Sequence, residues 1–334
     1  MYEKLKQNKE LIATKALELI DPDYQKKSYD YIFKSKRDIL YSIDFMIEAL
    51  IIKDANILIN YFSWLTDILG SYDIKKEVVS KLYQLLLDLF RPYLEPDDLH
   101  FLTCIKPASF TKTNLEVTLS DGASTYLAHL LQKDRFKASS YIQSLVEANI
   151  SIEDIFLDIV QPAMHQIGLL WQKREISVAD EHLATVISQF AMTELYPIIF
   201  NTKKNGKRMV ACALGNELHE MGIRMVSDLF EYYGYETYYL GSNTPVSDLV
   251  TYLEAYLPDL VCLSVTLSSQ LSQLLELVSL IKSNERLTNV KLMIGGQAVS
   301  ALKEPLKTFN VDGYASNAKE AIKVGDRLVE LKRY

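Results

Sequence analysis

The sequence lacks any long apolar segment without charge, which argues against a membrane-spanning helix. No stretch of about 18 residues, the length that a helix needs to cross a bilayer, is apolar and uncharged throughout. The first residues, Met1 to Leu17, mix lysine and glutamate into a helical pattern, whereas a signal peptide requires an apolar stretch. We therefore expect a cytoplasmic protein that is not attached to a membrane.

The sequence has only three cysteines, and its 43 acidic residues outnumber its 36 lysines and arginines. Cys104, Cys212 and Cys262 are scattered in apolar surroundings without CxxC spacing, so we expect buried free thiols. The formal net charge of −7 argues against a nucleic-acid-binding surface. Half of the 334 residues are apolar and only 12 are glycine, which is typical of a helix-rich globular protein of two or three domains.

Residues 1–110 have the pattern of a helical module. Apolar residues recur every three or four positions from Ile39 to Leu50 and from Leu58 to Leu65. Prolines and acidic residues between Pro92 and Pro107 break this pattern, and we interpret that segment as a linker. Three aromatic residues are expected to lie in the module's core: Tyr61, Phe62 and Trp64.

A second helical stretch, residues 111–203, has the signature of a four-helix bundle. Ser151 and Ser177 each stand three residues before an aspartate, the spacing of a capping box that opens a helix. Four helices in this length would pack as an antiparallel bundle. The polar run after Asn201 contains no large apolar residue and is the best domain boundary in the sequence.

Beyond this boundary, in residues 207–334, short strand-like runs alternate with amphipathic stretches of helical length. The runs occupy five places: 208–215, 236–241, 260–266, 290–296 and 311–315. Alternating strands and helices predict a parallel sheet with helices on both faces, and five strands fit the flavodoxin-like doubly wound order. Ligands of such folds bind beyond the carboxyl ends of the strands, so we expect binding residues directly after the strands.

The first strand is followed by a loop in which a histidine stands between acidic residues and a glycine. His219 comes two residues after Glu217 and three before Gly222. A loop histidine beside an acid is more often a solvated surface residue than a ligand. The third strand ends in Ser264-Val-Thr266 and the fourth in Gly295-Gly296, although a glycine pair alone is equally typical of a tight turn.

Together, the acidic-x-His-x-x-Gly, Ser-x-Thr and Gly-Gly motifs resemble the cobalamin-binding domain of methionine synthase, corrinoid methyl carriers and cobalamin-dependent photoreceptors. The resemblance covers the last third of the chain and implies that His219 binds the cobalt in place of the cofactor's dimethylbenzimidazole. Glu217 would hold the other imidazole nitrogen, a position that is Asp in many members. Ser264 and Thr266 would offer hydroxyls to the nucleotide tail, which the glycines Gly222, Gly295 and Gly296 would let approach closely.

The bundle carries a second motif, Trp171 followed after nine residues by Glu181-His182. Trp171 would close one helix and the pair would lie in the first turn of the next, so the three would meet at one end of the bundle. Singly, such residues are usually core or solvated. Together they resemble the Trp-x9-Glu-His signature of adenosylcobalamin-dependent photoreceptors, in which they surround the adenosyl group. In the best-known members a histidine follows the tryptophan, where this chain has Gln172.

The resemblance implies a cobalamin-binding light sensor, not an enzyme, that signals through a protein partner. The N-terminal module has no basic recognition helix, so DNA is not the expected target. It resembles the helical N-terminal region of some cobalamin sensors that signal through proteins, which implies a signalling role for residues 1–110. The chain is also similar to the photocobilins, which hold a bilin such as biliverdin as well as cobalamin. We also expect a homo-oligomer. The alternative function is that of a corrinoid carrier for a methyltransferase system, which shares the bundle and the His219 motif; a radical mutase subunit fits less well, because there is no room for a catalytic barrel.

Overall fold

The computed structural model describes residues 2–111, 117–215 and 218–330, which form two compact units. The first unit comprises residues 1–114 with the short segments Leu267–Ser272 and Ala301–Glu304. The second comprises 115–266, 273–300 and 305–334. In the described part of the chain, no helix combines the length and the apolar character that crossing a membrane requires.

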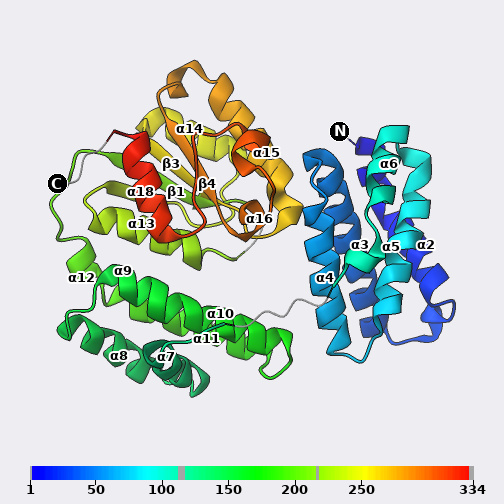
Figure 1. Cartoon of the computed structure of the whole chain (residues 1–334), viewed down its shortest axis with the longest axis horizontal. Coiled ribbons are helices and arrows are strands. Elements are labelled where there is room, and N and C mark those ends of the chain that lie inside the picture. The colour runs from blue at the N-terminus through cyan, green and yellow to red at the C-terminus, as the bar shows by residue number, and fades with distance from the viewer. Residues whose placement is uncertain (1, 112–116, 216–217, 331–334) are drawn as a thin grey trace. The chain divides into compact units, whose positions relative to one another are not determined.

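The first unit is helical, as its apolar spacing predicts (Figure 1). Its α-helices are α1 (Glu3–Gln7), α2 (Lys9–Ile20), α3 (Tyr29–Ile52), α4 (Asn56–Gly70), α5 (Lys76–Phe90) and α6 (Pro96–Cys104). Short 3₁₀ turns are η1 (Tyr24–Lys26), η2 (Arg91–Tyr93), η3 (Pro107–Ser109) and η5 (Ser268–Gln270). The linker interpretation of residues 92–107 is wrong, because Pro96 opens helix α6 from its first position, where a proline has no hydrogen bond to lose.

Two other expectations about side chains in this unit need correction. Tyr61 and Phe62 are buried in its core as predicted, but Trp64 is 38% exposed, because it lies on the outer side of α4. Cys104 is exposed at the end of α6, whereas Cys212 and Cys262 are buried as expected and all three are free thiols.

The second unit begins with the predicted four-helix bundle. Its helices are α7 (Asp121–Leu131), α8 (Arg135–Glu147), the continuous run of α9 (Ile152–Asp154), η4 (Ile155–Val160) and α10 (Gln161–Gln172), and α11 (Val178–Thr193). Ser177 and Asp180 form the predicted capping box at the start of α11, and the Ser151 hydroxyl accepts the Asp154 N–H at the start of α9. The bundle prediction is confirmed.

One turn of the third bundle helix, η4, is a π-helix. Pro162 follows it and has no N–H to donate to the carbonyl of Asp158, four residues earlier. That carbonyl accepts the hydroxyl of Ser120, 3.2 Å away, which also caps α7. The proline thus disturbs the helix without leaving the Asp158 carbonyl unpaired.

The rest of the second unit is a parallel sheet with the strand order β2-β1-β3-β4-β5, the flavodoxin-like order that was predicted (Figure 1). The strands are β1 (Arg208–Ala213), β2 (Glu236–Tyr239), β3 (Leu260–Ser264), β4 (Lys291–Gly295) and β5 (Gly313–Tyr314). The helices are α12 (Tyr196–Ile199), α13 (Met221–Tyr232), α14 (Val246–Tyr256), α15 (Leu271–Ser283), α16 (Gln297–Ser300), α17 (Pro305–Phe309) and α18 (Ala318–Leu328), with a 3₁₀ turn η6 (Glu285–Leu287). Helices α13 and α18 pack together on one face of the sheet.

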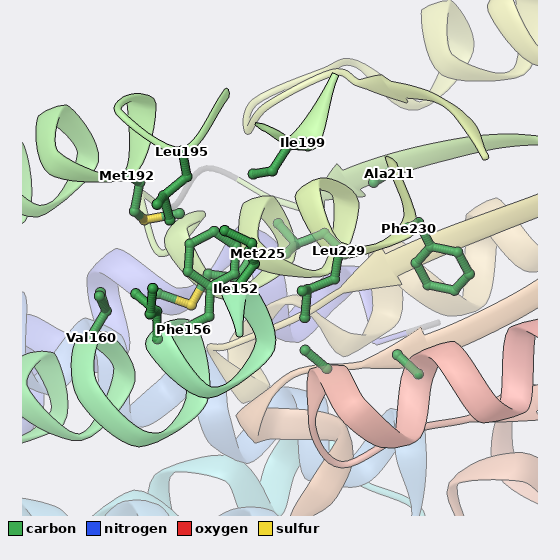
Figure 2. Close-up of a cluster of buried hydrophobic side chains, with 14 of the residues drawn as sticks. Ile152, Phe156, Val160, Met192, Leu195, Ile199, Ala211, Met225, Leu229 and Phe230 are labelled. Atoms are coloured by element: carbon green, nitrogen blue, oxygen red, sulfur yellow. The ribbon is translucent and has the colours of Figure 1, made fainter. Parts of the chain in front are cut away.

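Bundle and sheet share one hydrophobic core. Phe156 and Leu195 of the bundle side belong to the same buried cluster as Met225 and Leu229 of α13, and these four side chains are at most 3% exposed (Figure 2). Helix α13 is therefore covered from two sides, by the strands and by the base of the bundle. Truncating a buried aromatic such as Phe156 typically costs about 3–5 kcal/mol, so this contact is a major part of the unit's stability.

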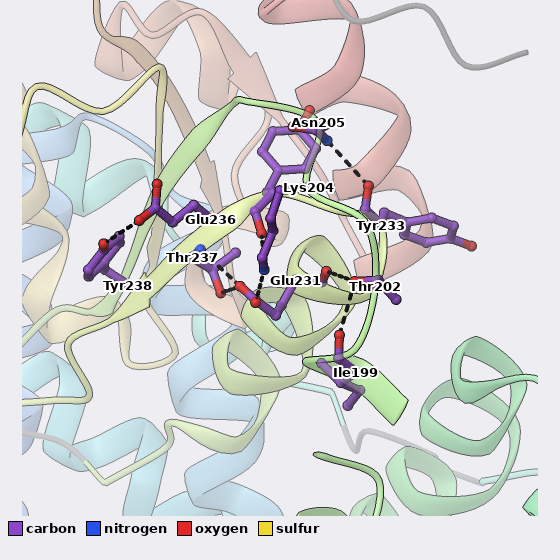
Figure 3. A network of polar contacts seen from close by, with 10 residues as sticks. Ile199, Thr202, Lys204, Asn205, Glu231, Tyr233, Glu236, Thr237 and Tyr238 are labelled. Atoms are coloured by element: carbon purple, nitrogen blue, oxygen red, sulfur yellow. Dashed lines mark hydrogen bonds and ion pairs between the residues drawn. The ribbon is translucent and has the colours of Figure 1, made fainter. Parts of the chain in front are cut away.

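Polar residues secure the segment that joins bundle and sheet. The buried Glu231 carboxylate of α13 pairs with the Lys204 ammonium group and accepts the Thr237 N–H at 3.0 Å and its hydroxyl at 2.8 Å (Figure 3). The Thr202 hydroxyl donates to the Glu231 backbone carbonyl at 2.9 Å. The polar run that the sequence marks as a boundary is thus fastened to α13; the domain limits drawn there stay a prediction.

We predict that Glu231→Ala lowers the free energy of unfolding by about 2 kcal/mol, because hydrogen bonds to charged groups contribute about 1.5–3 kcal/mol. Urea denaturation measures the change. The control is Glu236→Ala, which removes an exposed carboxylate bound to Tyr238 and should change stability by less than about 0.5 kcal/mol. Equal losses in the two variants would contradict the role given to Glu231.

Candidate functional site

The predicted binding residues gather at the carboxyl edge of the sheet. Ser264 pairs in register with Ala213 at the end of β1 and with Gly295 at the end of β4, so three neighbouring strands end together. His219 follows β1 in the loop that leads into α13, and its side chain is exposed. Glu217 lies outside the described residues. The arrangement is the one that a ligand above this edge would need.

The glycine pair after β4 has a structural reason of its own. Gly296 has a φ of +93°, and a Cβ atom there would lie 2.4 Å from the Val265 carbonyl oxygen and 2.8 Å from the Ser264 hydroxyl. A Cβ at Gly295 would lie 2.9 Å from the Ala315 carbonyl oxygen. The strand ends are therefore packed so closely that neither position tolerates a side chain. Close approach of a nucleotide to this pair remains a prediction.

Gly222 and Gly168 show the opposite behaviour. Both lie in helices, α13 and α10, without a positive φ, and a Cβ at either position would meet no atom within 4 Å. Glycine within a helix costs about 1 kcal/mol relative to alanine, so it needs a reason that the protein's own packing does not supply here. A bulky ligand that approaches these helices would supply one, and the residues present therefore fit such a group.

The three residues of the bundle motif lie where α10 ends and α11 begins; their convergence on one ligand stays a prediction. Trp171 lies in the last turn of α10, and Glu181 and His182 lie in the first turns of α11. The Glu181 carboxylate is 2.5 Å from His182 Nδ1 and accepts the Thr185 hydroxyl at 3.1 Å. Trp171 is 38% exposed, so it is not a core residue and part of its aromatic surface is open to a ligand.

A cluster of polar groups lies at the start of α13, just behind the His219 loop. The Arg224 guanidinium donates to the Tyr196 hydroxyl through Nε at 3.0 Å and Nη2 at 2.6 Å. Asp228, one turn further along, is buried, and burial raises the pKa of its carboxyl to about 7 despite the nearby Arg224. Burial also raises the pKa of Tyr239 at the end of β2, and the Glu220 carboxylate beside it adds to this effect.

Sequence reasoning missed two features of the site. Gly168 passed unnoticed although a glycine three residues before Trp171, inside a helical pattern, is a detectable signal. Arg224 and Asp228 stand four residues apart in the expected helix after the first strand and so lie on one face of it, a spacing that could have identified a polar pair. Within the described residues, no group of three or more His, Cys, Asp or Glu side chains could hold a metal ion.

Comparison with known proteins supports the resemblance at the level of the cofactor. Residues 207–323 match a family model described as a B12 binding domain, and residues 124–196 match a second model of the same description. Dimethylamine corrinoid protein 1 of Methanosarcina acetivorans is 25% identical over 162 residues, 48% of this chain and 75% of that protein. Dimethylamine corrinoid protein 3 of the same organism is 23% identical over 177 residues, 52% of this chain and 82% of that protein.

A solved structure shares the fold of the same region. The monomethylamine corrinoid protein of Methanosarcina barkeri aligns with a TM-score of 0.54 at 19% identity, covering 62% of this chain and 96% of that one. The matched family models begin at residue 124, so neither of them covers the helices of the first unit.

We predict that the stability of the protein depends on pH through Asp228. Its pKa is raised from 3.8 to about 7, so between these values the folded protein keeps a proton that the unfolded chain has lost. Stability therefore falls as the pH rises through this window, by up to about 1.4 kcal/mol per unit. In urea titrations, Asp228→Asn should gain about 2 kcal/mol relative to wild type between pH 5 and pH 7. A difference that stays constant with pH would contradict the protonated state assigned to this carboxyl.

Proposed function

We propose that this chain, a cobalamin-binding protein by its two B12 binding domains, is a corrinoid carrier that works with methyltransferase partners. The observation that carries the proposal is the similarity to dimethylamine corrinoid proteins, which are 25% and 23% identical over 75% and 82% of their own length. The chain itself would not catalyse the transfer. It would hold the cofactor and present it to its partners.

Different residues at the sheet edge would bind the cobalt and the nucleotide tail of the cofactor. His219 would ligate the metal from the loop after β1, since imidazole is a common ligand of such metals, and Glu217 would fix the imidazole's orientation. Ser264 and Thr266 would donate hydrogen bonds to the nucleotide tail, and Gly222 would leave space for it. When bound, cobalamin supplies a cobalt ion that accepts and releases a methyl group.

A second candidate function, a light sensor that binds adenosylcobalamin, is favoured by one observation. Trp171 at the end of α10 and the hydrogen-bonded pair Glu181 and His182 at the start of α11 have the sequence spacing of the photoreceptor signature. In this case the first unit would pass the signal to a protein partner, and a bilin could be a second chromophore. Gln172 in place of the second cobalt-binding histidine counts against it. The names of the relatives favour the carrier.

Light distinguishes the two functions. The protein is loaded with adenosylcobalamin in the dark, and its hydrodynamic radius and thermal stability are measured before and after green light. A carrier should have the same radius and thermal stability with adenosylcobalamin in the dark, with adenosylcobalamin after light, and with hydroxocobalamin loaded in the dark. A change of radius on illumination that hydroxocobalamin loaded in the dark reproduces would overturn the carrier and support the sensor, because it would tie the conformation to loss of the adenosyl group.

We predict that His219→Ala weakens cobalamin binding about tenfold or more and changes the absorption spectrum of what remains bound, because the metal loses its protein ligand. The side chain is exposed, so the free energy of unfolding should change by less than about 0.5 kcal/mol. His100→Ala, in the first unit, is the control and should bind as wild type does. Unchanged spectra and affinity in His219→Ala would remove this residue from the ligand role.

We predict opposite effects of Gly168→Ala on the empty and the loaded protein. Without cofactor, stability should rise by about 0.5–1 kcal/mol, because alanine favours the helix and its methyl group meets no atom. Affinity for cobalamin should fall about tenfold, the cost of an added methyl group in a filled site. Gly70→Ala is the matched control, since a Cβ at Gly70 also meets no atom within 4 Å; its affinity should not change. A stabilised Gly168→Ala with full affinity would place the cofactor elsewhere.

A further inference from the structure

Among the described residues, one polar contact near each end of helix α13 joins it to the bundle or to α12, the short helix that follows the bundle. At its carboxyl end, Tyr233 donates to the Glu153 carboxylate at 2.7 Å, and Lys319 of α18 pairs with the same carboxylate at 2.8 Å. At its amino end, Arg224 donates to Tyr196 of α12, the short helix between bundle and β1. The first contact is far from the His219 loop, and the second lies just behind it.

The two contacts differ in their chemistry. Glu153 is a carboxylate satisfied by two donors from the α/β side. Arg224 places two N–H groups on one neutral phenol oxygen, although a carboxylate on the same helix face would be the stronger acceptor. Asp228 is that carboxylate, four residues along α13, and its Oδ2 atom is buried without a hydrogen-bond partner among the described residues.

A buried acceptor without a partner costs free energy, so its persistence calls for an explanation. The Arg224 guanidinium interacts electrostatically with Tyr196, Asp228 and Tyr239, and each of these groups raises its pKa. A change of side-chain rotamer would let the guanidinium leave Tyr196 and pair with Asp228. The contact at the amino end of α13 thus has an alternative within the protein, whereas the Glu153 carboxylate already holds both of its donors.

We infer that Arg224 is a positioning residue with two partners: bound to Tyr196 it holds the base of the bundle on α13, and bound to Asp228 it lets that base loosen. The bundle would then open at the amino end of α13, beside His219, while Glu153 keeps the far end attached. The consequence for the cofactor rests on the proposed function; the exchange of partners does not.

Hydrogen–deuterium exchange of the cofactor-free protein tests the exchange of partners, at pH 8, where Asp228 is mostly ionised. Tyr196→Phe keeps the ring that packs on Phe200, at 4.9 Å between centroids, but removes the acceptor. Exchange in residues 192–200 should become about tenfold faster. Asp228→Asn removes the competing charge, so exchange in the same segment should become slower than in wild type.

The place of the change separates this inference from a general gain in stability. Stabilisation by Asp228→Asn alone would slow exchange throughout the second unit, whereas loss of the competing partner should slow it most in residues 192–200. Tyr238→Phe, which removes an exposed hydroxyl bound to Glu236 on β2, is the matched control and should leave the segment unchanged. Arg224→Lys, with one donor group in place of the fork, should exchange at a rate between wild type and Tyr196→Phe. Faster exchange in both Tyr196→Phe and Asp228→Asn, or no change in either, overturns the inference.

A second measurement separates this inference from the proposed function. Stopped-flow mixing with hydroxocobalamin should show faster binding by Tyr196→Phe and slower binding by Asp228→Asn than by wild type. If the exchange rates shift as expected and wild type does not bind hydroxocobalamin, the proposed function fails and the exchange of partners stands. If wild type binds and the variants bind at its rate, Arg224 does not control access to the site.

Discussion

Helix α13 packs against the sheet and against the base of the bundle at the same time, and the packing of the second unit depends on this double contact. One side of the helix packs on β1 and β2, and another belongs to the buried cluster that includes Phe156 and Leu195 of the bundle side. Its amino end emerges from the His219 loop. A shift of α13 would therefore move the His219 loop and the base of the bundle together, because the loop is joined to the helix and the base is packed against it.

Because α13 is covered on two sides, acidic residues on it are buried and depend on partners within the protein. Glu231 and Asp228 are both buried acids on the helix, but their environments differ. Glu231 has a lysine and two donors from Thr237, which compensate the loss of water. Asp228 has Arg224 nearby without a hydrogen bond to its Oδ2 atom, and its pKa rises accordingly. The helix thus contains one anchored carboxylate and one whose best partner is engaged elsewhere.

Features that depend on local sequence could be predicted, and features that depend on tertiary packing could not. The strand runs, the capping box at Ser177 and the strand order follow from periodicity and from the rules of parallel sheets. The exposure of Trp64 and Trp171 and the need for glycine at 296 depend on which atoms arrive from distant segments, such as the Val265 carbonyl. Family resemblance indicated where a ligand would bind, but not that Arg224 binds a tyrosine.

The balance between carrier and sensor turns on what the bundle must do. A sensor needs a bundle that stays closed until one event releases it, whereas a carrier needs one that opens and closes repeatedly, at low cost, for each partner. The apolar base opposes full detachment, because separating Phe156 and Leu195 from α13 would expose buried area at about 25 cal/mol per Å². A pivot at Glu153 would preserve that base near the far end of α13 while the Arg224 contact changes partner without leaving a buried charge unpaired. Repeated, inexpensive opening is what such a pair of contacts would provide, and this favours the carrier.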